Sequence, residues 1–196
     1  MKQALFVFFL ILFLNKGVCQ QSGYYLPLPE KWGVEKILFP IQFDPLVPYT
    51  GNEELRFTPG WGDSKSEEYW SYDFLWFVDG SPKLNADILH RYLTQYFTGL
   101  YLTNQKTKST ASAGSFTDAQ FKKVATAEND NETYEGEIST LNFLNKQQIK
   151  FNVRVHVRNF GSANKSAILF EVSPHDYVHP VWAELDSIVA GFHLKE

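Results

Sequence analysis

The clearest alternation of apolar and polar positions lies within residues 56–79, which read RFTPGWGDSKSEEYWSYDFLWFVD. In the second half of this segment one phase is apolar at every position: Trp70, Tyr72, Phe74, Trp76 and Val78. The other phase mixes polar and apolar side chains. Because successive side chains of a strand point to opposite faces, this pattern predicts a β-strand near the middle of the core, with one apolar and one mixed face.

Shorter runs with the same period predict further strands at residues 36–43, 53–58, 121–127, 134–144, 150–158 and 167–172. Pro40 has no amide hydrogen for a ladder, so the first of these runs is expected at a sheet edge or a bulge. The alternation slips near Thr140, as a β-bulge would produce. In residues 150–158 the phase that contains His156 is polar, which predicts a sheet face exposed to water and a solvated histidine.

Two segments instead carry apolar residues at helical spacing. The first extends from residue 84 to 100, with Ser81 or Asn85 as its N-cap and Gly99 where the helix begins to end. The second extends from Pro180 to about Phe192. The order of strands, helix, several strands and helix predicts an α+β fold, a mostly antiparallel sheet packed by two amphipathic helices.

The first nineteen residues have the layout of a secretory signal peptide. Lys2 precedes an apolar run at residues 4–14, which is too short to span a bilayer, and small residues follow at Gly17 and Cys19. We expect cleavage after Cys19, which leaves residues 20–196 as one α+β domain without a membrane span. The alternative is that Cys19 is lipid-modified. Either route predicts a secreted or periplasmic protein.

Removal of this segment takes away Lys2 and Lys16 and no acidic residue, so the net charge changes from −4 to −6. An acidic surface argues against nucleic acid as a partner, because phosphate binding needs a basic patch. The chain has one cysteine, Cys19. The mature protein is therefore expected to have no disulfide and no thiolate chemistry, and packing must stabilise it.

The histidines offer one spacing of interest. His175 and His179 are four residues apart, with Asp176 between them, which on a helix would suit a metal ion. Pro174 and Pro180 flank them, and this predicts a connecting loop in which such a spacing has no fixed geometry. We therefore predict no metal site, and expect His179 to cap the last helix.

Acidic and aromatic residues gather between the predicted strand at residues 53–58 and the predicted central strand that contains Trp70. A pair of carboxylates beside aromatic rings is what glycoside hydrolysis requires, and aromatic rings also line many small-molecule sites. The candidate ligand-binding residues are Trp61, Asp63, Glu67, Glu68 and Tyr69. No serine lies in a nucleophile elbow and no glycine-rich loop has the pattern of a phosphate site, so no catalytic residue and no cofactor are predicted.

The segment ELRFTPGWGDSKSEEYWSYDFLWFVDG, preceded by LPLPEKWGVEKILFPIQFDP, resembles an uncharacterised family of secreted proteins from Gram-negative bacteria, especially Bacteroidetes. The resemblance covers about residues 27–100. It implies export, and the family has no established activity that could be carried over to residues of this chain. The order of strands and helices is also loosely similar to that of PsbP-like exported proteins, a likeness of fold order that does not imply function.

These patterns favour a secreted or periplasmic, non-catalytic binding or accessory protein that uses the aromatic surface around Trp61. Its partner is predicted to be a small molecule, a glycan or a protein, and the sequence does not specify which. One alternative is a carbohydrate-active hydrolase that uses the loop carboxylates. Another is a protein-interaction module whose partner docks at an exposed edge strand at residues 37–43.

Overall fold

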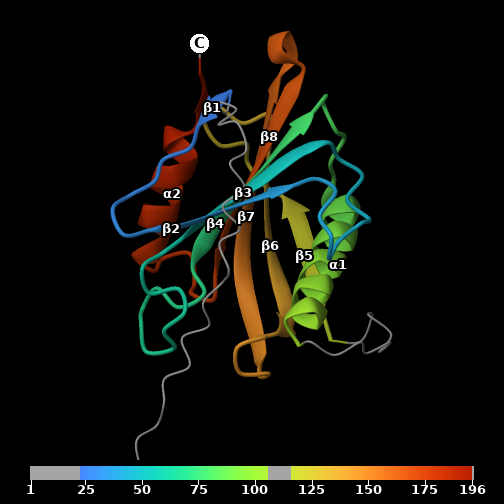
Figure 1. The fold of residues 1–196 in the computed structure, drawn as a ribbon. Coiled ribbons are helices and arrows are strands. Elements are labelled where there is room, and N and C mark those ends of the chain that lie inside the picture. The colour runs from blue at the N-terminus through green and yellow to red at the C-terminus, as the bar shows by residue number, and fades with distance from the viewer. Residues whose placement is uncertain (1–22, 106–115, 196) are drawn as a thin grey trace, which may run out of the picture.

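A computed structural model describes residues 23–105 and 116–195 of the chain (Figure 1). The predicted signal segment with Cys19 and most of the polar stretch at residues 103–115 lie outside the described residues. The described residues form an α+β fold, as predicted from the order of the elements. Neither described helix is both long and apolar enough to cross a membrane.

The main sheet has seven antiparallel strands in the order β2-β3-β4-β8-β7-β6-β5. Two runs of sequential neighbours meet where β4 pairs with β8, and a separate small sheet pairs β1 with β9. The strands are β1 (Tyr24–Tyr25), β2 (Gly33–Leu38), β3 (Gly51–Phe57), β4 (Tyr72–Asp79), β5 (Asp118–Lys123), β6 (Glu132–Leu141), β7 (Gln148–Phe160), β8 (Lys165–Ser173) and β9 (His193–Leu194). A short 3-10 helix, η1 (Gly161–Ala163), joins β7 to β8.

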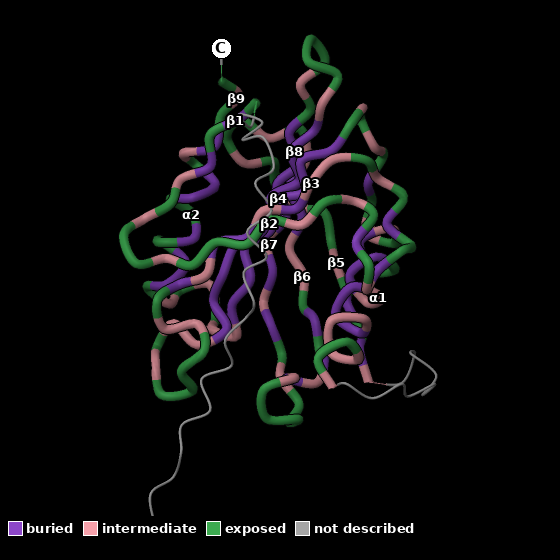
Figure 2. Tube along the Cα trace, viewed as in Figure 1, coloured by how far each residue is buried: buried purple, intermediate pink, exposed green. Residues whose placement is uncertain are grey.

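The strand that the sequence placed near the middle of the core is β4, and this prediction is confirmed. Its apolar phase, with Trp70 just before it, is buried throughout and belongs to the largest cluster of core residues. Phe74 stacks on Phe170 of β8 at 4.2 Å between ring centroids and on Tyr96 of the helix above at 5.5 Å. Figure 2 shows this burial as a continuous purple stretch along the central strands.

One helix lies over each face of the sheet (Figure 1). α1 (Ala86–Asn104) begins at Asn85, whose side chain accepts a hydrogen bond from the Ile88 amide at 2.8 Å, so the second of the two predicted caps is the one used. The prediction that the helix begins to end at Gly99 is wrong, since the helix continues for another turn to Asn104. Gly99 is needed for packing, since a Cβ there would collide with the carbonyl oxygen of Phe43.

α2 (Val181–Gly191) covers the opposite face. Ile188 and Val189 pack with Leu75, Phe77 and other apolar residues of the sheet's second face. The extended arm before β2 lies along the same side, and Trp32 packs against the apolar residues at the start of α2.

Two local predictions about strands are wrong. The register between β6 and β7 is unbroken from Glu132 to Leu141, so there is no bulge at Thr140. The predicted strand at residues 36–43 ends at Leu38, and the chain then turns through a cis Phe39–Pro40 peptide. β2 does lie at the sheet edge, as the proline indicated.

Candidate functional site

The β3–β4 loop, residues 58–71, holds the predicted site residue Trp61 against the body of the protein. The hydroxyl of Thr58 donates to the carbonyl oxygens of Glu68 and Ser71, which ties the two ends of the loop together. Within the loop, the Trp70 amide donates to the Trp61 carbonyl at 3.0 Å, and the two indole rings pack at 4.9 Å. The loop therefore brings both tryptophans to the same place, under α1.

Trp61 and Trp70 form part of the wall of a cavity of about 380 Å³. This volume lies within the usual range for a small-molecule site, about 300–1,000 Å³. The wall comes from the last turns of α1, from β2, β3 and β4, from the β2–β3 connection, from the β3–β4 loop and from the segment after β6. Its residues are Glu35, Ile37, Phe43, Leu55, Phe57, Trp61, Trp70, Tyr72, Tyr96, Leu100, Thr103, Asn104 and Phe143.

The backbone of Trp70 is strained where it enters this wall. Its φ of 54° lies in the left-handed region, which a bulky residue rarely adopts. The ring is packed from several sides, by Phe143 at 5.0 Å and Phe151 at 5.5 Å between centroids. Such strain persists where the surroundings over-determine a conformation, and it is found most often at functional sites.

The indole nitrogens of Trp61 and Trp70 are buried and have no hydrogen-bond acceptor among the described residues. A buried donor without a partner costs about 1–3 kcal/mol, so most such groups in folded proteins are paired. The other buried indole on this face is satisfied, since Trp76 donates to the Glu53 carboxylate at 2.6 Å. Two unpartnered N–H groups in one aromatic wall are the feature that sets this cavity apart.

Acidic groups stand at two depths beside the cavity. Glu35 of β2 lines its mouth, and partial burial raises the pKa of this carboxyl group. Glu53 is completely buried, and desolvation raises its pKa to about 7 although Trp76 and Tyr96 both donate hydrogen bonds to it. The cavity is therefore apolar along its wall, with one carboxyl group at the entrance.

The structure disperses the other predicted ligand-binding residues. Asp63 accepts from the Lys65 amide in an exposed turn, and the Glu68 carboxylate accepts from the Gly60 amide inside the loop. The Tyr69 hydroxyl accepts from the Asn142 side chain at 2.7 Å. Among the residues that line the cavity, the predicted set is represented by Trp61 alone.

Glu67 points instead to the other face of the sheet. Its carboxylate lies 3.2 Å from the Nε2 atom of His179, beside the start of α2. His179 also accepts a hydrogen bond at Nδ1 from the amide of Val181, the first residue of α2. The predicted capping role of His179 is therefore confirmed.

Several cavity residues were not predicted from the sequence. Tyr96, Leu100 and Phe143 were assigned to the apolar patterns of a helix and a strand, where a residue that fills the core and one that lines a cavity look alike. Thr103 and Asn104 lie beyond residue 100, where the helix was predicted to stop. Positions so far apart in the sequence come together only through tertiary packing.

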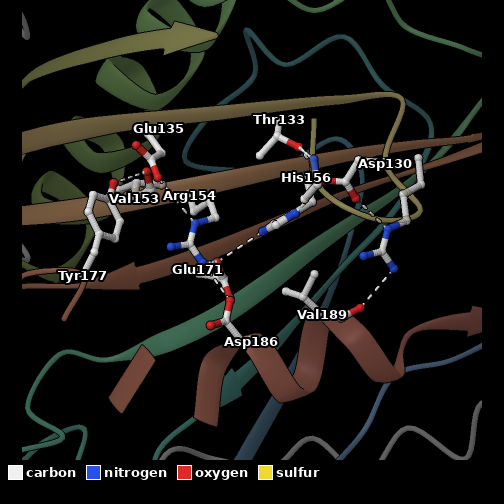
Figure 3. Close-up of polar contacts among 12 residues, drawn as sticks. Asp130, Thr133, Glu135, Val153, Arg154, His156, Glu171, Tyr177, Asp186 and Val189 are labelled. Carbon is white, nitrogen blue, oxygen red and sulfur yellow. Dashed lines mark hydrogen bonds and ion pairs between the residues drawn. The ribbon is translucent and has the colours of Figure 1, made fainter. Parts of the chain in front are cut away.

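A second concentration of polar groups lies between the sheet and α2 (Figure 3). His156 of β7 is between two carboxylates, with Nδ1 2.7 Å from Asp130 and Nε2 3.2 Å from Glu171. Arg154 donates to Glu171 at 3.2 Å and to Asp186 of α2 at 2.7 Å. We call these residues, with Arg158, the α2-face charge network.

This arrangement shows that the prediction of a solvated His156 is wrong. The side chain is 6% exposed, because α2 and the turn that carries Asp130 cover a face that the sequence alone leaves open. Burial by itself would lower the pKa of His156, but hydrogen bonds and charge from Asp130 and Glu171 raise it to about 9. The histidine is therefore positively charged at neutral pH and binds the two carboxylates.

Asp73 of β4 lies beside this network and is paired across the ladder with Glu171. Both of its carboxylate oxygens are buried without a hydrogen-bond partner in the described part of the chain. Burial, and then the negative charge of Glu171, hold the pKa of Asp73 well above its ordinary value. Burial without a partner among the described residues therefore favours the protonated form of Asp73 more than it would be favoured in an exposed aspartate.

The chain was also compared with known proteins. No family model matches it, and no curated protein matches it at a significant level. The resemblance to secreted proteins of Gram-negative bacteria therefore stays a prediction.

Proposed function

We propose that this protein is a secreted or periplasmic, non-catalytic binding protein that takes a small, largely apolar molecule into the cavity behind Trp61. The observation that supports this proposal most directly is a pair of buried indole N–H groups that have no acceptor among the described residues. Both tryptophans belong to the aromatic wall of a cavity of about 380 Å³. These N–H groups have almost no accessible surface, so the acceptor atoms of a ligand would reach them after a shift of the two rings, while the apolar body of the ligand packs against the wall.

The cover of this site is part of the proposal. α1 would act as an amphipathic helix that packs its apolar stripe on the sheet and leaves its last turn over the cavity. Leu100, Thr103 and Asn104 of that turn line the wall. A molecule that enters past Glu35 would therefore contact both the helix and the edge of the sheet.

The composition of the wall favours an apolar ligand over a glycan. Seven of its residues are aromatic, and its three polar residues without a ring, Glu35, Thr103 and Asn104, are all exposed. A sugar needs many precisely placed hydrogen bonds, which this wall does not supply. The loop carboxylates also give little support to a hydrolase, because Asp63 and Glu68 are engaged in turns and Glu67 faces away.

Binding of N-phenyl-1-naphthylamine tests the proposal. This neutral probe becomes more fluorescent in apolar surroundings, and we expect saturable binding with one site per chain. Leu100→Trp fills the cavity from the α1 side and should weaken probe binding at least ~10-fold, since the lost contact area is hydrophobic.

Val178→Trp is the matched control, because it adds the same side chain at a position that is 94% exposed. It should leave the probe affinity within about twofold, and thermal unfolding should confirm that both variants are folded. If both variants bind the probe as the parent protein does, the cavity is not the binding site and the proposal fails.

A further inference from the structure

Three groups that can bind a metal ion meet where the β3–β4 loop approaches the start of α2. They are the carboxylate of Glu67 and the imidazoles of His175 and His179, and one ligand atom of each lies within 4.8 Å of the others. The residues come from two segments more than a hundred positions apart in the sequence. The flanking prolines do produce a connecting loop, but this loop folds so that the two rings stack at 3.9 Å with 9° between their planes.

The backbone around His175 is held firmly. Its amide donates to the Ser173 hydroxyl at 3.1 Å, and its carbonyl oxygen accepts from the side chains of Asn152 at 3.0 Å and Trp182 at 3.1 Å. These partners belong to β7, β8 and α2, which are all packed parts of the core. The ring of His175 is therefore presented from a rigid frame, as a metal ligand should be.

A second observation points to a ligand at this place. The Nε2 atom of His175 is buried and has no hydrogen-bond partner among the described residues. The Nε2 atom of His179 lies 3.2 Å from the Glu67 carboxylate. Two ligands at about 2.0 Å from a tetrahedral zinc ion are about 3.3 Å apart, so this pair already has the spacing that zinc requires.

We propose that Glu67, His175 and His179 form a binding site for a divalent transition-metal ion of the zinc type. Two imidazoles and a carboxylate are a ligand set that zinc accepts, with water in the fourth position. The ion would join the β3–β4 loop to the start of α2. This site is separate from the aromatic cavity, and the proposal does not rest on the proposed function.

Metal binding requires two local changes that the geometry defines. The metal–nitrogen bond of a histidine lies in the ring plane, so the stacked rings must turn until their planes meet at the ion. His179 must also carry its proton on Nδ1, which ends the 3.2 Å hydrogen bond from the Val181 amide. That amide is one of the donors in the first turn of α2 that have no partner within the helix, and the Glu67 side chain, 85% exposed, can move with the imidazole.

The test uses untagged protein freed of metal with a chelator and titrated with zinc chloride by calorimetry. We expect one zinc ion per chain and a thermal unfolding midpoint several degrees higher, because the ion binds the folded state alone. Magnesium chloride should give neither effect, since Mg²⁺ prefers an octahedral set of oxygen ligands. Zinc affinity should fall as the solution is acidified, because the imidazoles must be unprotonated.

Ligand variants decide whether the zinc binds at this site. Glu67→Gln and His175→Ala should each lower zinc affinity at least ~10-fold, whereas the matched controls Glu184→Gln and His193→Ala, both exposed, should leave it unchanged. Absence of stoichiometric binding, or equal losses in ligand and control variants, would overturn the proposal. Binding of the naphthylamine probe should be the same in all four variants, which separates failure of this site from failure of the cavity.

Discussion

His156 takes its ionisation state from the residues that cover it. In the sequence it is one polar residue between two arginines, whose charges would lower its pKa. In the fold, Asp130 and Glu171 lie within hydrogen-bond distance of its two ring nitrogens, and they raise the pKa to about 9. The charge of a single residue here is decided by parts of the chain far from it in sequence.

A pH dependence of stability follows from this shift. The folded-state pKa of about 9 is above the ordinary histidine value, so the stabilisation is complete below about pH 6.5 and is lost as the pH rises through 9. We expect the parent protein to exceed His156→Gln in free energy of unfolding at pH 6. The difference should shrink by on the order of 2–3 kcal/mol by pH 10.

Urea unfolding of both proteins at a series of pH values measures this difference, and titrations common to both proteins cancel in it. A difference that stays constant between pH 6 and pH 10 would show that His156 is not held in its charged form.

At the scale of elements, α1 shows how packing overrides a local signal. Glycine often marks the end of a helix, so Gly99 was expected near the last turn. The helix instead continues to Asn104, and Gly99 allows its backbone to pass close to the carbonyl of Phe43. This contact sets the height of the last turn, which covers the cavity.

Gly99→Ala should therefore destabilise the protein by about 1–3 kcal/mol, because the added methyl group overlaps a backbone oxygen. Intrinsic helix propensity alone predicts a gain of about 1 kcal/mol from the same change. Thr103→Ala, at an exposed position of the same helix, is the control and should change stability by less than about 0.5 kcal/mol. A more stable Gly99→Ala protein in urea unfolding would contradict the packing assigned here.

Elements with a strong local period were predictable from the sequence. β4 and the start of α1 follow from alternation and from a capping asparagine, both of which act over a few residues. A bulge was predicted at Thr140 because the apolar positions change phase at Leu141 and Phe143. This change coincides with the end of β6 at Leu141, which the alternation alone does not reveal. His156 was predicted to be solvated because it lies in a polar phase of its strand, and such a phase usually faces water. α2, which comes later in the chain, covers this face instead.

At the scale of the whole molecule, the sheet separates two different environments. The face under α1 is aromatic and encloses the cavity, whereas the face under α2 carries the charge network and the Glu67, His175 and His179 group. The β3–β4 loop reaches both, with Trp61 on one side and Glu67 on the other. The sequence showed that this loop gathers candidate residues, and it did not show that they serve opposite faces.

Trp61 could be selected from its setting between two glycines in a polar loop. Its neighbours in the cavity wall could not be identified from the sequence, because Tyr96, Leu100 and Phe143 have the pattern of ordinary core residues. Their place at a cavity depends on how α1 and the end of β6 are spaced above the sheet, which no local pattern encodes.

The most direct measurement of the central claim is the set of indole N–H resonances in a nitrogen-15 correlation spectrum. The chain has five tryptophans, so five signals are expected, and Trp61→Phe and Trp70→Phe assign the two that belong to the cavity. Titration with N-phenyl-1-naphthylamine should shift these two signals most and leave those of Trp32 and Trp182, on the α2 side, in place. If the cavity signals stay fixed while the probe binds, or if the largest shifts belong to Trp32 or Trp182, the account of a ligand site behind Trp61 is wrong.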